Sequence, residues 1–159
     1  MEFSVYEADL KGIFVREVHL RSGDNVRYKC LPQSFWNSGR QRLCMPDGTV
    51  LLEWERSLTL WVAKYILYRD GEEIGTVQKQ PLSNRYEVVV EGETIEVRGN
   101  LWQKEFTFVY DGVEVAKVSR KILRNEGAFG IAIMEGQDDL LFLAILTIII
   151  DVIRRQNSS

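Results

Sequence analysis

Residues 140–150 read LLFLAILTIII, an apolar run that is broken only by Thr147. A helix on a protein surface needs a single apolar stripe, whereas a segment that is apolar on nearly every side must be enclosed. A membrane span needs about 20 consecutive apolar residues, roughly twice the length of this run. The run therefore predicts a core helix that the rest of the protein surrounds.

The β-branched residues 148–150 would also suit a buried strand. Length favours a helix, because strands usually end after about 4–8 residues. The flanks agree, since the aspartates before the run and the arginines after it complement a helix dipole. Thr147, Asp151 and Arg155 recur at four-residue spacing and would form one narrow polar seam along a helix. We therefore predict a central helix over about 138–155.

The chain before this helix reads as a series of short strands separated by turn residues. The candidate strands are 12–19, 25–30, 50–54, 58–68 (with a break), 73–79, 86–90, 94–97, 105–110, 113–119 and 129–134. Asp-Gly pairs at 47–48, 70–71 and 111–112 predict hairpin turns, because both residue types tolerate positive φ. About a dozen antiparallel strands before an all-apolar helix predict a β-barrel that encloses the helix.

Residues 68–79 are similar to residues 109–120, and each copy is followed by another candidate strand. Two copies and no blade signature argue against a propeller. The similarity predicts a β-hairpin unit that is repeated within one barrel. The match of Lys79 with Arg120 suggests either a shared binding position or two solvated strand ends, and we favour the second.

Length and composition are those of one globular domain, residues 1–159, that can bury a core without disulfides or metal. A formal net charge of −3 argues against nucleic-acid binding and against a general electrostatic grip on anionic membranes. It leaves room for a local basic patch. We expect no signal peptide in the first residues, and we expect Cys30 and Cys44 to be reduced thiols. We expect a cytoplasmic monomer.

The order of elements resembles the tubby C-terminal-like superfamily, and in particular the LURP-one-related proteins. The resemblance is carried by residues 68–79, 86–92, 110–121 and 138–155, and it covers roughly 52–155. It implies a twelve-stranded barrel around a central hydrophobic C-terminal helix. The chain is similar to a small bacterial member of this group.

The resemblance also implies a class of ligand. Tubby domains bind phosphoinositide headgroups through basic residues on the barrel surface, and phospholipid scramblases share the fold and act on membranes. No tubby lipid-binding residue matches a position in this sequence, so none is carried over. Residues 137–139 lack the spaced oxygen ligands of a calcium loop.

Signatures of catalysis are mostly missing from the sequence. His19 is the single histidine, which excludes a metal site built from several histidines. It lies in a strand-like run, where a surface role is expected. A nucleophile pair of Cys30 or Cys44 with His19 has no support from spacing. We predict a protein that is not an enzyme and that holds no metal or cofactor.

The first candidate binding surface is the segment 98–104, which places a tryptophan between basic residues. Arg98, Trp102 and Lys104 combine an aromatic ring with cationic neighbours, which suits a lipid headgroup or a protein partner. The alternative is that Trp102 folds back as a cap on the barrel, and for this side chain we favour that arrangement.

The second candidate surface is the polar segment 33–42, which displays Phe35 and Trp36 next to Arg40 and Arg42. Loops carry binding functions more often than the elements they connect. The segment is equally compatible with packing against the barrel mouth.

These features predict a binding module for an anionic phospholipid headgroup or another anionic ligand, peripheral to the membrane and without transmembrane insertion. The main alternative is a protein-interaction or regulatory domain that uses the same loops and binds no lipid. An enzyme of unrecognised type is the least favoured alternative.

Overall fold

The computed structural model describes residues 2–11, 17–32, 39–59, 62–80, 85–101, 103–119 and 129–157. These residues form twelve strands followed by one helix. The strands are β1 (Phe3–Lys11), β2 (Glu17–Ser22), β3 (Asn25–Pro32), β4 (Arg40–Cys44), β5 (Val50–Thr59), β6 (Val62–Arg69), β7 (Glu72–Lys79), β8 (Tyr86–Val90), β9 (Glu93–Asn100), β10 (Glu105–Tyr110), β11 (Val113–Val118) and β12 (Phe129–Met134). The helix, α1, spans Asp139–Asn157.

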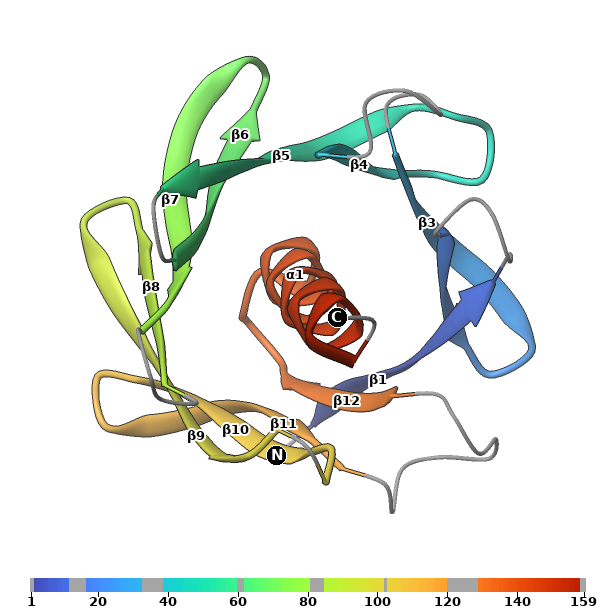
Figure 1. Ribbon diagram of the computed structural model, residues 1–159. Coiled ribbons are helices and arrows are strands. Elements are labelled where there is room, and N and C mark those ends of the chain that lie inside the picture. The colour runs from blue at the N-terminus through green and yellow to red at the C-terminus, as the bar shows by residue number, and fades with distance from the viewer. Residues whose placement is uncertain are drawn as a thin grey trace.

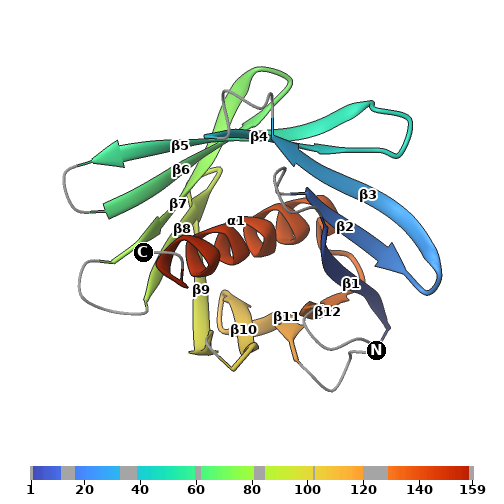
Figure 2. The same ribbon diagram turned by 45° about the vertical axis from the view of Figure 1, so that its right-hand side comes forward.

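The strands form a closed antiparallel barrel. Each strand pairs with its neighbour in the sequence, and β1 closes the barrel by pairing with β12. Figure 1 looks into the barrel and shows α1 inside the ring of strands, and Figure 2 shows the helix running through it. The prediction of a β-barrel around a hydrophobic helix is confirmed.

The barrel has two different ends, because successive connections between antiparallel strands alternate between them. We call one the turn end; it holds the β2–β3, β4–β5, β6–β7, β8–β9 and β10–β11 turns and the start of α1. We call the other the loop end; it holds the connections that follow β1, β3, β5, β7, β9 and β11, and the end of α1.

The hairpins at 70–71 and 111–112 are tight two-residue turns, as predicted, and both residues of each have positive φ. Residues 91–92 form the same turn with glutamate in the first position, and this turn was not predicted. The 47–48 turn is wider than an ordinary two-residue hairpin. There the Asp47 carboxylate accepts a 2.9 Å hydrogen bond from the backbone N–H of Thr49.

A shared irregularity accompanies four of the hairpins. In each, the pairing register shifts by one residue just after a fully buried side chain. The shifts follow Leu20 in β2, Leu43 in β4, Leu67 in β6 and Phe108 in β10. Bulges increase the local twist and bend of a strand, so their recurrence near the turn end helps the sheet to curl around the helix. The similarity between 68–79 and 109–120 thus corresponds to two hairpins with equivalent bulges.

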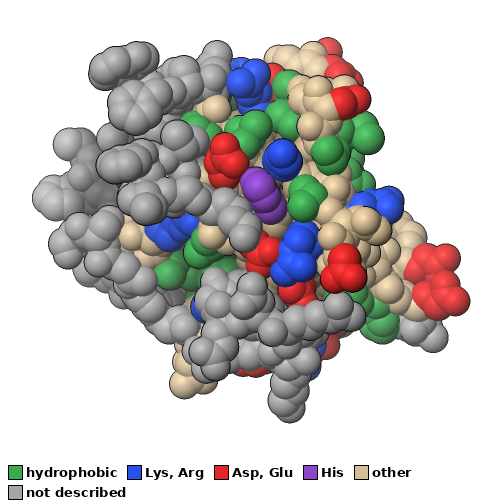
Figure 3. Space-filling model, turned by 90° about the vertical axis from the view of Figure 1, so that its right-hand side faces the viewer, with side chains coloured by type: hydrophobic (Ala, Val, Ile, Leu, Met, Phe, Trp, Pro, Cys, Tyr) green, Lys and Arg blue, Asp and Glu red, His purple; other side chains and the backbone are tan. Residues whose placement is uncertain are grey.

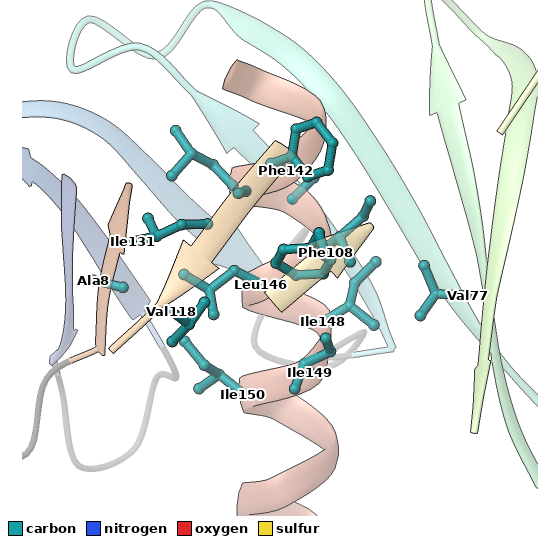
Figure 4. Packing of buried hydrophobic residues seen from close by; sticks show 14 of the residues in the cluster. Ala8, Val77, Phe108, Val118, Ile131, Phe142, Leu146, Ile148, Ile149 and Ile150 are labelled. Atoms are coloured by element: carbon teal, nitrogen blue, oxygen red, sulfur yellow. The ribbon is translucent and has the colours of Figure 1, made fainter. Parts of the chain in front are cut away.

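The helix fills the barrel with apolar side chains on every side. Residues 142–150 are all buried. Figure 4 shows Leu146, Ile148 and Ile149 projecting from different sides of α1 toward side chains of the barrel wall. Phe142 packs on Phe108 of β10 with 5.5 Å between ring centroids. Burial on all sides explains why this segment lacks the polar face of a surface helix.

The polar seam predicted along the helix lies inside the barrel and has partners there. The Thr147 hydroxyl donates to the Leu143 carbonyl at 2.8 Å and lies 3.4 Å from the Cys30 thiol. Asp151 accepts hydrogen bonds from the wall and from Arg155 of its own helix. Each of these three side chains therefore has at least one hydrogen-bond partner within the protein, as burial requires.

Two strands were not predicted, β1 and β4. In β1, the charged Glu7 and Asp9 obscure the strand pattern, and the structure places them on the outer face, where Arg21 of β2 binds both. In β4, the inward Gln41 is polar, and it accepts a 3.0 Å hydrogen bond from the Trp54 indole. Such bonds conceal strands from a reading based on apolar alternation.

Other boundaries differ by a few residues. The predicted strand 58–68 is divided between the end of β5 and β6. The predicted strand 12–19 overlaps β2 only at its end, and residues 12–16 lie outside the described residues. The helix begins at Asp139 and ends at Asn157, against the predicted 138–155.

Candidate functional site

Both predicted groups of basic residues lie at the loop end of the barrel. Arg98 is near the end of β9 and Lys104 is in the turn that leads into β10, while Arg40 and Arg42 are at the start of β4. Trp102 lies outside the described residues, as do residues 33–38 with Phe35 and Trp36, and so does Arg120.

Arg98 is exposed and makes a two-pronged ion pair with Glu96 on the same face of β9. Its Nε lies 2.8 Å from Glu96 Oε1, and its Nη2 lies 2.8 Å from Glu96 Oε2. This hydrogen bonding, with the charge of Arg98 behind it, lowers the pKa of the Glu96 carboxyl. An anion that binds Arg98 must therefore compete with a carboxylate that is already in place.

Lys104 is held at the turn between β9 and β10 by its backbone and by an aromatic ring. It has a positive φ of 58°, and its N–H donates to the Leu101 carbonyl at 3.1 Å. Its ammonium lies 4.8 Å from the centroid of the buried Phe129 ring, which is cation–π distance. The side chain is half-buried, so the positive charge sits close against the barrel rim.

Arg40 is engaged in a similar way on β4. Its Nη2 lies 2.9 Å from Glu53 Oε2, and its Nη1 lies 3.6 Å from Glu55 Oε2. The guanidinium also lies over the Tyr68 ring, 5.3 Å from the centroid. Arg42, two residues further along, is half-buried. Arg40 thus lies within ion-pair distance of two carboxylates, whereas Arg98 is paired with one.

The two groups do not form one continuous patch. Strands β5 to β8 separate β4 from β9 around the barrel, and Figure 1 shows these two strands on different sides of the helix. The end of α1 brings a third basic group, Arg154 and Arg155, to the same end. The sequence predicts these arginines as partners of the helix dipole, and Arg155 also as part of the polar seam. Their place after an enclosed helix further indicates that they reach the barrel mouth.

The turn end carries the opposite charge. Each of its five described hairpin turns contributes an exposed acidic residue, and so does the connection to the helix. These residues are Asp24, Asp47, Asp70, Glu91, Asp111 and Glu135. The two ends of the barrel therefore differ in charge. Carboxylates lie at the turn end, and basic groups lie around the C-terminal end of α1 at the loop end.

His19 and Cys30 lie on opposite faces of the barrel wall. His19 is on the outer face of β2, 3.1 Å from the Glu17 carboxylate, and Figure 3 shows it among acidic and basic side chains. Cys30 points inward to Thr147, and burial raises the pKa of its thiol to about 12. This geometry excludes a nucleophile pair between the two.

The comparison with protein families agrees with this architecture. The family model of LURP-one-related proteins matches residues 16–151. The chain belongs to the LURP-one-related family. An X-ray structure of a protein from Arabidopsis thaliana matches with a TM-score of 0.71 and 15% sequence identity, over 93% of this chain and 91% of that one. At this identity the match shows a shared fold. No curated protein matches the chain significantly.

In this LURP-one-related barrel, the described residues bring no group of three His, Cys, Asp or Glu side chains together as a metal site. Among the same residues, no helix has the length and apolarity to cross a membrane.

Proposed function

We propose that this LURP-one-related protein is a non-enzymatic binding module that holds an anionic ligand at the loop end of its barrel. The ligand class that its tubby-like fold favours is a phospholipid headgroup at a membrane surface. The observation that carries the proposal is the opposite charge of the two barrel ends.

Net charge alone would make an acidic protein avoid an anionic surface. Every described turn of the turn end, however, carries an exposed acidic side chain, at the opposite end of the barrel from Arg98, Lys104 and the helix terminus. An anionic surface orients a protein that is polarised in this way, so that the loop end of the barrel faces the surface. The acidic end is then held outside the screening length, about 8 Å at physiological salt.

The contacts of the basic residues set the expected strength of binding. To bind an anion, Arg98 must break both of its hydrogen bonds to Glu96, and Arg40 must break its hydrogen bond to Glu53. Such an exchange replaces one exposed ion pair by another and yields little net free energy. Binding should therefore be weak, reversible and sensitive to salt.

Sedimentation with anionic vesicles tests the proposal. Phosphatidylglycerol vesicles at low salt should bind the protein, and binding should disappear as salt is raised. A double variant with Arg98→Ala and Lys104→Ala should lose binding without a change in melting temperature. Replacing Arg40 and Arg42 by Ala tests the second group, and Arg27→Ala on the exposed part of β3 is the matched control.

The alternative is a protein-interaction domain, and one observation favours it. Phe3, Val5 and Val113 have exposed fractions of 50%, 45% and 51%, near the turn end. Phe3 and Val5 lie two residues apart on the outer face of β1, and contiguous exposed apolar residues commonly mark protein contacts. If no anionic vesicle binds at low salt, the lipid proposal is wrong, and loss of a partner by Phe3→Ser would support the alternative.

A further inference from the structure

A cavity of about 740 Å³ lies beside the β8–β9 pair, next to the Arg98 ion pair. This volume is in the range of about 300–1,000 Å³ that small-molecule sites occupy. Its lining includes Arg85, Glu87 and Glu96, together with the polar side chains of Gln80 and Thr94. The cavity is open to solvent, and its lining presents both signs of charge to a ligand.

The two carboxylates face the cavity from directly opposed positions. Glu87 and Glu96 are cross-strand partners in the antiparallel pair, while the next pair, Val88 and Ile95, is buried in the core. Side chains of opposed residues start only about 5 Å apart, and like charges placed this way destabilise the pair. A cation between them would remove that repulsion.

The two carboxylates, Glu87 and Glu96, have hydrogen-bond partners of different charge. Glu96 receives both hydrogen bonds of the Arg98 guanidinium. Glu87 receives a 2.8 Å hydrogen bond from the Gln80 amide, which carries no charge. This partner of Glu87 is thus neutral, and a positively charged donor would make a stronger contact with the carboxylate.

Arg85 places a positive charge at the same cavity. The guanidinium of Arg98 is the main cause of the lowered pKa of Glu96, and the charge of Arg85 adds to it. A simple cation in the cavity would meet Arg85, and a simple anion would meet the two carboxylates. A ligand with both charges can contact all three groups without placing like charges together.

We propose that this cavity binds a small zwitterion, with its ammonium group at Glu87 and Glu96 and its anionic group at Arg85. The anionic half of this ligand rests on the function proposed above, and the ammonium half adds a ligand class to it. Two sources carry this chemistry, the headgroup of an aminophospholipid and a free small zwitterion.

Calorimetry with three soluble probes tests the ligand class. Phosphoethanolamine carries both groups, glycerol phosphate only the anion, and ethanolamine only the ammonium. We expect phosphoethanolamine to bind at least about ten-fold more tightly than either of the other two, as a lost charge-assisted hydrogen bond implies. Equal affinity for glycerol phosphate and phosphoethanolamine would overturn the proposal.

Two matched variants locate the ammonium site. Glu87→Gln keeps the shape of the side chain and should weaken phosphoethanolamine binding about ten-fold, because the charged acceptor is lost. Glu91→Gln makes the same change of charge at the turn end of the same hairpin and should leave affinity unchanged. Equal melting temperatures of the two variants show that the barrel is intact. Unchanged affinity in Glu87→Gln would refute the assignment.

Vesicles distinguish the two sources of the ligand. Phosphatidylglycerol vesicles with added phosphatidylethanolamine should bind more protein than pure ones if the headgroup is the ligand, and free phosphoethanolamine should compete. Binding of the free probe with no effect of phosphatidylethanolamine assigns the site to a soluble zwitterion. Because the calorimetry needs no vesicles, failure of the membrane proposal and failure of the zwitterion site give different results.

Discussion

The hydroxyl of Tyr65, which projects inward from β6, donates a 2.6 Å hydrogen bond to Asp151 Oδ2 on the enclosed helix. The same oxygen accepts a 2.9 Å hydrogen bond from Arg155. At the other end of the helix, Tyr6 of β1 donates to Asp139 at 2.8 Å. The two aspartates are twelve residues apart, about 18 Å along a helix axis. These two bonds therefore fix both the depth and the rotation of the helix in the barrel.

Replacing Tyr65 by Phe should destabilise the protein by about 1–3 kcal/mol, because a buried carboxylate loses a donor that water cannot replace. Tyr6→Phe should have a smaller effect, since Asp139 is only half-buried and solvent can reach it. Urea denaturation measures both. A Tyr65→Phe variant that is no less stable than Tyr6→Phe would show that the Asp151 bond does not hold the helix.

Ile145→Asp tests whether the helix is the core of the barrel. Ile145 is fully buried, so a carboxylate there would lie in an apolar interior at a cost of several kcal/mol. Proteins of this size have about 5–15 kcal/mol of stability, and we expect insoluble or unfolded protein. Val113→Asp on the exposed surface should fold normally. A soluble Ile145→Asp with an unchanged melting temperature would contradict the enclosed helix.

Gly99 should tolerate no side chain. Its φ is +123°, and a Cβ there would lie 2.5 Å from the Glu105 carbonyl oxygen and 2.8 Å from Phe106 Cα. Both obstacles are backbone, so Gly99→Ala should separate β9 from β10 and lower stability by more than about 2 kcal/mol. Gly92→Ala has positive φ and open space, and should cost about 1–2 kcal/mol. Thermal melts of the two variants separate the two effects. Gly92→Ala has backbone strain alone, and Gly99→Ala has backbone strain together with a steric clash.

Stability should fall at alkaline pH. Burial, with the help of nearby aspartates, raises the pKa of Tyr65 and Tyr6 above the usual value of 10.0, and burial raises that of Tyr86. Burial also raises the pKa of Cys30 from 9.0 to about 12. Above pH 9–10 the unfolded chain loses these protons while the folded protein keeps them, so unfolding becomes more favourable.

The stabilising effect of these groups is complete below pH 9 and is lost as the pH rises toward their folded pKa values. Urea midpoints between pH 8 and about pH 11 should therefore decrease steadily. Tyr65→Phe should flatten this decrease. Midpoints that stay constant to pH 11 would contradict the burial of these groups.

Removing the Glu96 carboxylate should strengthen binding to phosphatidylglycerol vesicles. In Glu96→Gln, Arg98 no longer has a charged partner on β9, and the affinity for a purely anionic surface should rise about two- to five-fold. Glu91→Gln also removes one negative charge, but at the turn end, and should have little effect. A similar gain in both variants would show that net charge, rather than Arg98, controls binding.

The sequence was sufficient for the barrel and its helix because two signals are local. A helix that is apolar on all sides must be buried in the core, and an Asp-Gly pair predicts a turn from two adjacent residues. The strand β4 was missed because its inward Gln41 is satisfied by Trp54, a contact that exists only after folding.

The candidate site was predictable to a different extent. The pairing of Arg98 with Glu96 follows from strand alternation, which places residues two apart on one face, and the sequence contained that signal. The opposition of Glu87 and Glu96 depends on the register between two strands, and that register becomes visible only in the structure. The cavity beside them was not predictable for the same reason.

The position of the helix after all twelve strands has a consequence for biosynthesis. The strand β1 cannot find its partner β12, and no strand can find its interior contacts, until the ribosome has made the last third of the barrel and then α1. At about 5–20 residues per second, the first strand waits on the order of ten seconds. We expect the nascent chain to depend on chaperones during that interval, and the protein to fold late and in one cooperative step.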